Sequence, residues 1–240
     1  MLEFFDRIGF TMLDLAALAL FAVVWFGYEW VLRLLGPRHR TINFTMKLVR
    51  RQWMEGMARR EARIADAALM GHFMQSTSFF ASTTVLVAAA LVGALSSLDH
   101  IQPSIEALDF TVKTSRSFFE LKVALPLAVF VAGFFRFTWG LRQFNYAIAL
   151  IGATPLPSHA PPDEAHTLAD LTATVLTSGA EAFNGGIRAY YFALACLFWF
   201  GGPIAFMVAT VAAVWTLLRR QIASETARAI RIEARKLTRY

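Results

Sequence analysis

The chain has 240 residues, of which 57% are hydrophobic and 17% are charged, and its mean hydropathy is +0.49. A soluble globular protein is less apolar and richer in charge, so this composition excludes an ordinary soluble domain and indicates a membrane protein. The formal net charge is +6, and no nucleic-acid-binding motif accompanies it. In a membrane protein such a charge is typical of contact with anionic lipid, so we expect membrane lipids as partners and no nucleic acid.

Four stretches contain the roughly 20 mostly apolar residues that a transmembrane helix needs. They cover residues 12–35, 73–98, 121–139 with a helical extension to about 152, and 189–218. The last stretch contains Gly202 and Pro203, and we expect a kink there because proline removes a backbone donor. The sequence predicts an all-α integral membrane protein with four transmembrane helices in a single membrane domain, residues 1–240.

Two basic segments lie outside these stretches. Residues 41–70 place apolar side chains at helical steps, and basic side chains fill the other faces, among them Arg50, Arg51, Arg59 and Arg60. Such an amphipathic helix can lie on the membrane with its basic side chains facing lipid, or it can pack against its own bundle. The tail, residues 219–240, predicts a second basic helix.

An acidic, proline-rich segment separates the third and fourth stretches. Residues 153–187 hold four Asp or Glu residues and no Lys or Arg. Its prolines predict a loop, and its second half predicts a helix from about Asp163 to Phe183 that ends at the sequence Asn-Gly-Gly.

The positions of these charges bear on orientation, because loops rich in Lys and Arg stay in the cytoplasm. Four full crossings place residues 41–70 and 219–240 on opposite sides. A fourth segment that folds back at the Gly-Gly-Pro sequence places both inside, but its two arms are short for a membrane about 30 Å thick, so four full crossings are the preferred interpretation. Acidic residues before the first span and arginines after it favour an outside N-terminus.

Polar residues within two of the spans are the candidate functional residues. The candidates in the second span are Gln75, Ser78, Ser82 and Thr83, and those at the end of the third are Arg136, Arg142, Gln143 and Asn145. They can line a polar pathway, or they can form an interface in which small side chains let helices approach closely. A buried arginine needs a partner, and Asp14 and Glu29 are possible ion-pair partners of Arg136. Lys122 and Arg188 are expected to be interfacial anchors.

No sequence pattern indicates an enzyme. The five histidines are scattered, and no motif of a serine hydrolase, nucleotide-binding loop or zinc protease is present. The single cysteine, Cys196, lies in an apolar run, and no cysteine or histidine cluster has metal-ligand spacing. We therefore expect a protein that is not an enzyme and that needs no cofactor or metal.

Three sequence blocks carry a resemblance to a known family. They are RRQWMEGMARREARIADAALMGHFMQSTSFFASTT, FELKVALPLAVFVAGFFRFTWGLRQFNYAIALIGATP and FNGGIRAYYFALACLFWFGGPIAFM. In content and order they resemble the bacterial and plant membrane-protein family known as domain of unknown function 599. The resemblance implies an integral membrane domain and brings no activity or ligand. It places the following residues in the family's motif blocks: Arg51, Trp53, Ser78, Ser82, Thr83, Arg136, Arg142, Asn145 and Arg188.

Two functional hypotheses follow. The first is a channel- or transporter-like protein for a small ion or solute, located in a bacterial inner membrane. A four-helix chain fills its own centre with side chains, so such a protein is expected to be a homo-oligomer. The alternative is a non-transport membrane scaffold that binds anionic lipid or a protein partner.

Overall fold

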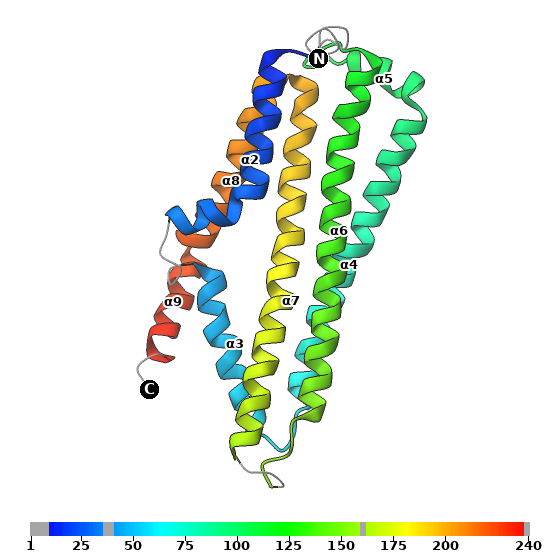
Figure 1. Cartoon of the computed structure of the whole chain (residues 1–240). Helices are drawn as coiled ribbons and strands as arrows, with labels where there is room; N and C mark the ends of the chain where they lie inside the picture. Colours follow the sequence, from blue (N-terminus) through cyan, green and yellow to red (C-terminus); the bar gives the residue numbers. More distant parts are fainter. Residues whose placement is uncertain (1–9, 36–40, 159–161, 238–240) are drawn as a thin grey trace. The chain divides into compact units, whose positions relative to one another are not determined.

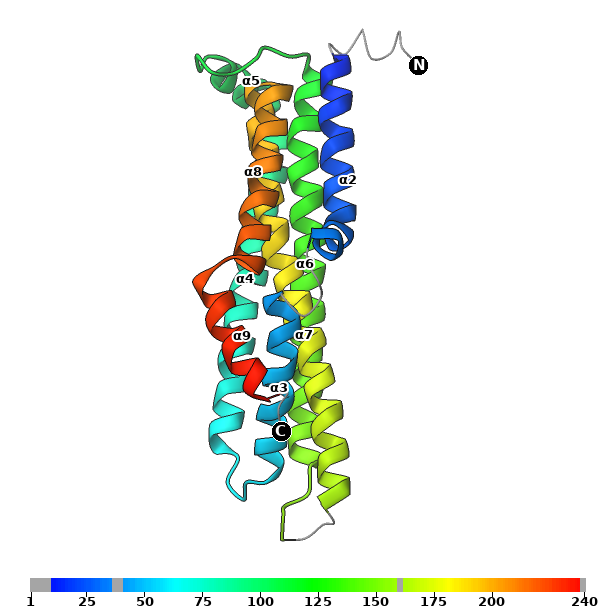
Figure 2. The same cartoon turned by 90° about the vertical axis from the view of Figure 1, so that its left-hand side faces the viewer.

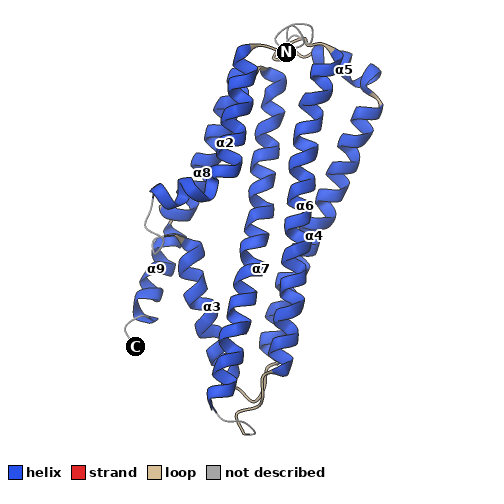
Figure 3. Ribbon diagram, viewed as in Figure 1, coloured by secondary structure: helices blue, strands red, loops and turns tan. Residues whose placement is uncertain are grey.

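The computed structural model describes residues 10–35, 41–158 and 162–237, and these residues form helices joined by short connections (Figure 3). In chain order, the helices are α2 (Met12–Leu35), α3 (Ile42–Ala58), α4 (Ile64–Ser96), α5 (Leu98–Glu106), α6 (Arg116–Ala153), α7 (Pro162–Leu197), α8 (Pro203–Ile222) and α9 (Glu225–Leu237) (Figure 1). The described residues contain no strand, which confirms the all-α prediction.

Four of these helices are long and apolar enough to cross a membrane, which also agrees with the sequence prediction. They are α2, α4, α6 and the segment that begins with α8. The α6 helix runs unbroken for 38 residues and contains Pro126. At 1.5 Å per residue it is about 57 Å long, well beyond the roughly 30 Å hydrocarbon core of a bilayer.

The chain divides into two compact units. Unit 1 consists of Met1–Leu35, Thr83–Phe134 and Ile187–Leu218, and unit 2 consists of Gly36–Ser82, Phe135–Gly186 and Arg219–Tyr240. The helices α4, α6 and α7 each contribute a segment to both units. Each unit has a buried apolar core of its own.

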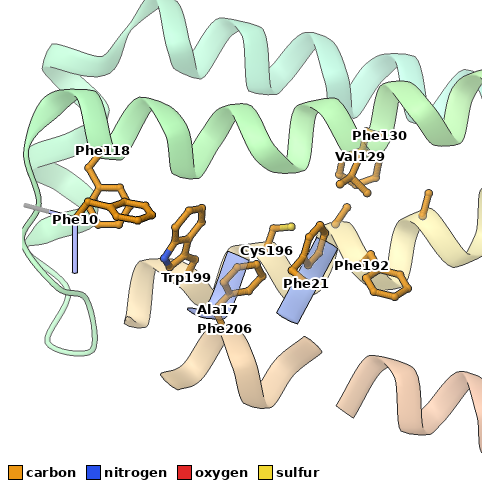
Figure 4. Close-up of a cluster of buried hydrophobic side chains, with 12 residues drawn as sticks. Phe10, Ala17, Phe21, Phe118, Val129, Phe130, Phe192, Cys196, Trp199 and Phe206 are labelled. Carbon is orange, nitrogen blue, oxygen red and sulfur yellow. The ribbon is translucent and has the colours of Figure 1, made fainter. Parts of the chain in front are cut away.

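Aromatic rings from α2, α6, α7 and α8 form the core of unit 1 (Figure 4). The ring of Phe21 lies 5.6 Å from that of Phe192 and 5.4 Å from that of Phe206, measured between centroids. In one continuous helix, Phe192 and Phe206 would lie about 21 Å apart and could not both touch Phe21. The chain therefore reverses direction between them.

This reversal corrects the prediction of a single helix over residues 189–218. The α7 helix ends at Leu197, a 3₁₀ turn covers Phe198–Gly201, and α8 begins at Pro203. Gly202 has a φ of 105°, a conformation that glycine adopts without a steric penalty. Pro203 then opens α8, where its missing N–H has no helical partner to lose. The Gly-Gly-Pro sequence is thus a helix-to-helix turn, not a kink.

Two further boundaries differ from the prediction. Residues 41–70 form the whole of α3 and the start of α4 instead of one helix. Asp66 accepts hydrogen bonds from Trp53 and Arg60 and holds the chain in a turn between the two helices. Most of the segment 153–187 is helix, since α7 begins at Pro162 and continues through the Asn-Gly-Gly sequence.

The glycines of α7 are contact points with α6, which explains why they do not end the helix. In unit 2, a Cβ added to Gly179 would lie 2.6 Å from the ring of Phe144, and one added to Gly186 would lie 2.5 Å from the ring of Phe137. Both phenylalanines are buried. The absent side chains therefore let aromatic rings pack directly on the backbone of α7.

The helices α3 and α9 contact each other in unit 2, and both views show them side by side (Figures 1 and 2). The basic segment after the first span and the basic tail consequently belong to the same compact unit. Unit 2 holds 17 of the 23 Lys and Arg residues of the chain but only nine of its 17 Asp and Glu residues.

The glycine contacts predict a measurable loss of stability. Gly186→Ala should destabilise the protein by about 1–2 kcal/mol, because overpacking against Phe137 outweighs the better helix propensity of alanine. Gly71→Ala is the matched control, since nothing lies within 4 Å of its added Cβ and it should be neutral or stabilising. Melting temperatures in detergent measure both changes. A Gly186→Ala protein at least as stable as the wild type would contradict this account of the packing.

Candidate functional site

Among the described residues of unit 1, two charged side chains are almost completely buried. Asp14 on α2 is 2% exposed and Lys122 on α6 is 1% exposed. A buried charge is costly unless it is paired or hydrogen-bonded, so each needs a physical explanation.

Asp14 is held by three donors. The indole Nε1 of Trp199 donates to Oδ1 at 2.8 Å, and the backbone N–H and hydroxyl of Thr11 donate to Oδ2 at 3.0 and 2.6 Å. The hydroxyl of Thr11 accepts in turn from the backbone N–H of Asp14. This reciprocal arrangement caps the first turn of α2, and it fixes a carboxylate between the ends of α2 and α7.

Lys122 has aromatic neighbours. Its ammonium lies 4.6 Å from the ring centroid of Phe118, one helical turn back, and 5.9 Å from that of Phe200. Among the described residues it forms no ion pair with a carboxylate, although Asp14 and Glu106 are near enough to act on it electrostatically. The ammonium is therefore stabilised by ring faces and by two carboxylates at longer range.

The residues near Lys122 include a tightly bonded connection between α5 and α6. Gln102 donates from Nε2 to Glu106 and to the carbonyl of Thr114, both at 2.9 Å. The backbone N–H of Thr114 also donates to Glu106, and the Gln102 and Thr114 bonds lower the pKa of that carboxyl. Val112 donates its N–H to the carbonyl of Phe200 at 3.0 Å, so this connection is tied to the α7–α8 turn.

A second polar group lies toward the C-terminal end of α2. Arg188 pairs with Glu29 at 2.7 Å, and its guanidinium lies 4.5 Å from the ring centroid of Tyr28. A residue of α4 contributes a further polar contact: the hydroxyl of Thr84 forms a hydrogen bond with that of Tyr190 at 3.0 Å. Unit 1 thus contains polar groups at two levels: the buried Asp14 and Lys122 at one, and Arg188 with the exposed Glu29 at the other.

Comparison with family models identifies the group to which this sequence belongs. The model described as Protein of unknown function, DUF599 matches residues 16–226, which is most of the chain. The chain belongs to the DUF599 family. Comparisons with curated proteins and with solved structures give no significant match.

In this DUF599 protein, the predicted polar face of α4 points away from the chain's own core. Gln75, Ser78 and Ser82 are exposed and Thr83 is partly buried. The buried hydroxyls of the same helix are those of Thr77 and Thr84. Thr77 donates to the carbonyl of Phe73 one turn earlier, which is how a hydroxyl is satisfied within a helix.

The predicted residues of α6 divide in the same way. Gln143 is buried, whereas Arg136, Arg142 and Asn145 are exposed. Because Arg136 is exposed, the expected burial of this arginine is wrong. Its side chain lies against Gly185, where an added Cβ would come within 2.8 Å of it. The possible partners named for it, Asp14 and Glu29, are bound to Trp199 and Arg188 respectively.

The four arginines expected to face lipid are placed differently. Arg50 is 8% exposed and donates to the hydroxyl of Thr177 on α7, and this burial lowers its pKa against the opposing effect of Glu181. Arg51 pairs with Asp170 at 2.8 Å. Arg60 pairs with the buried Asp66 at 2.7 Å, and Arg59 is exposed. Three of the four therefore contact protein: Asp170 and Asp66 supply opposite charge to Arg51 and Arg60, and Thr177 supplies an acceptor to Arg50.

Sequence reasoning missed the role of Lys122. It was expected to be an interfacial anchor, like Arg188, because it lies near the start of a span. Two signals could have identified it: a lone lysine followed by 13 residues without charge, and aromatic residues at positions 118 and 119 one turn before it. Neither signal shows that Trp199 and Phe200 come from another helix to cover the same region.

The hydrogen bond to Asp14 can be tested by substitution. Trp199→Phe removes the indole donor and leaves Oδ1 of a buried carboxylate without that bond, which should cost about 1–3 kcal/mol. Trp215→Phe is the matched control, because Trp215 is 68% exposed and its substitution should change stability by less than about 0.5 kcal/mol. Thermal unfolding in detergent gives both values. Equal melting temperatures for the two variants would show that the Trp199–Asp14 bond contributes nothing.

Proposed function

We propose that this protein is a membrane transport-type protein for a small ion, and that the polar groups of unit 1 form its route. Lys122 is the observation that carries the proposal. A charged side chain at the centre of a transmembrane helix costs roughly 2.5–3.5 kcal/mol on insertion scales and less near its end, where Lys122 lies; charged residues in such segments are characteristic of ion and proton pathways. A purely structural role is better filled by an apolar residue, since the ammonium has no carboxylate at ion-pair distance among the described residues.

The distribution of the polar groups supports a route across the membrane. Asp14 and Glu29 are 15 positions apart on α2, which corresponds to about 22 Å along the helix. Lys122 is close enough to Asp14 to act on it electrostatically, and Arg188 is bound to Glu29. Polar groups therefore occur toward both ends of the span. An anion that approaches Lys122 would exchange part of its hydration for the ammonium donors, which form no ion pair with a described carboxylate.

The contact between α3 and α9 supports a proposal for the orientation. Helices that contact each other on one side of the membrane have an even number of crossings between them. We therefore propose that the second half of α7 adds a crossing to those of α4, α6 and α8, which with α2 gives five crossings in total. The excess of Lys and Arg in unit 2 supports a cytoplasmic location for that unit in a bacterial inner membrane. The proposal also includes a homo-oligomer, which the exposed polar face of α4, with Gln75, Ser78 and Ser82, supports as a contact between copies.

Ion flux through proteoliposomes tests the transport proposal. Wild-type protein should move at least one of H⁺, Na⁺ and Cl⁻ under an imposed gradient. Lys122→Gln should reduce that flux about tenfold or more, since a hydrogen bond to a charged group is worth about 1.5–3 kcal/mol. Lys113→Gln, an exposed lysine of the same unit, is the control and should keep the wild-type rate.

Melting curves accompany these assays so that a folding defect of Lys122→Gln is recognised. If that variant is unstable, Lys122→Met replaces it as an apolar variant of similar length. Wild-type protein that moves none of the three ions contradicts the proposal. That result leaves the alternative, a membrane scaffold that binds anionic lipid or a protein partner.

Cysteine labelling in intact cells tests the orientation. Cys196 is buried, so new cysteines can be introduced into the wild-type chain at the exposed positions Ser104 and Thr226. An impermeant maleimide should label Ser104→Cys and leave Thr226→Cys unlabelled until the cells are opened. Labelling of both positions in intact cells would mean an even number of crossings and would place the tail outside.

A further inference from the structure

One face of α6 in unit 2 combines aromatic side chains with an arginine. Phe135, Trp139, Arg142 and Tyr146 recur at steps of four, three and four residues, so they form a stripe along one side of the helix. Phe135 is 64%, Trp139 53% and Tyr146 45% exposed, and Arg142 is exposed as well. We call these four residues the α6 stripe.

The α6 stripe occurs at a definite depth along the helix. The helix starts at Arg116, which is exposed and pairs with Asp99 and Glu120, so this end is in water or at its boundary. About 20 residues cross the hydrocarbon core, so a crossing that starts at Leu121 ends at Gly140. Trp139, Arg142 and Tyr146 therefore come at the level of the opposite head groups. Tryptophan and tyrosine are enriched at that level.

Charge and hydrogen bonding make the stripe suitable for an anion. Residues 135–153 contain Arg136 and Arg142 and no Asp or Glu. Nε of Arg142 donates to the hydroxyl of Tyr146 at 2.6 Å, and its guanidinium carbon lies 5.8 Å from the centroid of that ring. The remaining N–H groups of Arg142 form no ion pair with a described carboxylate. A guanidinium held on one edge presents its other edge to a phosphate.

We propose that the α6 stripe binds the phosphodiester head group of an anionic phospholipid. Arg142 donates to the phosphate, Tyr146 positions Arg142, and Trp139 lies among the glycerol and head-group atoms. Phe135, one turn deeper, contacts the acyl chains. This site differs in kind from the ion route of unit 1, because it is exposed and needs no buried charge. It also differs from the arginines of α3, because Arg50 donates to the hydroxyl of Thr177 and Arg51 pairs with Asp170.

Lipid retention by the purified full-length protein tests the site. Protein stripped of lipid in detergent is titrated with phosphatidylglycerol or phosphatidylcholine, and bound lipid is counted by native mass spectrometry. Wild type should retain phosphatidylglycerol preferentially. Arg142→Gln should lower that retention about five- to tenfold and leave phosphatidylcholine unchanged, because one basic residue near an anionic head group is lost. Tyr146→Phe should produce a smaller loss, since it removes only the positioning hydroxyl.

Arg228→Gln, which removes an exposed arginine of α9, is the matched control and should retain lipid as the wild type does. Inorganic phosphate at equal concentration should not displace phosphatidylglycerol, which separates a lipid site from a site for the free anion. Equal retention by Arg142→Gln and wild type overturns the proposal. A Trp139→Ala, Arg142→Gln double variant that keeps its lipid but no longer forms oligomers also overturns the proposal. That result would mean that the stripe contacts a second copy of the chain.

Discussion

Three helices of this protein are nearly twice as long as a membrane is thick, and much of the remaining structure follows from that excess. The α4, α6 and α7 helices have 33, 38 and 36 residues, whereas about 20 cross a bilayer. An excess of this size needs its own means of stabilisation, because isolated helices in water are marginally stable. Unit 2 supplies it with a buried cluster that includes Met54, Met57 and Phe144. The ion pairs and hydrogen bonds between α3 and α7 add polar contacts to that cluster.

Hydrophobicity along the sequence was enough to predict the helical class and the long apolar helices, but glycine was harder to interpret. The same residue type ends a helix at Gly202 and allows a close helix contact at Gly186. The first role requires a positive φ and the second requires a neighbouring ring, and neither is visible in a local sequence pattern. The segments 189–218 and 153–187 were therefore misassigned for one shared reason. One local difference could have distinguished the two roles of glycine: Gly202 is followed by Pro203, whereas Gly186 is followed by Ile187.

The candidate site was less predictable than the fold, because it depends on which helices meet. Asp14 was a candidate by sequence, but its partner Trp199 is 185 positions away and comes into contact only because α7 reaches the start of α2. Lys122 becomes notable only when its burial is known. In contrast, Gln75, Ser78 and Ser82 do share a face, as their spacing predicted. The periodicity of a helix fixes which residues lie together on it, but not whether that face is turned inward.

The unbroken course of α6 makes the protein sensitive to the thickness of its membrane. Lys122 lies near the start of the apolar segment of α6 and Arg142 lies near its end, 20 residues further along the same helix. A bilayer thinner or thicker than that separation must be accommodated by tilt, local deformation of lipid or bending of the helix. Bending concentrates where a backbone hydrogen bond is missing, which in α6 is near Pro126. Pro126 is one turn from Lys122, so bending at this proline would change the surroundings of the buried lysine.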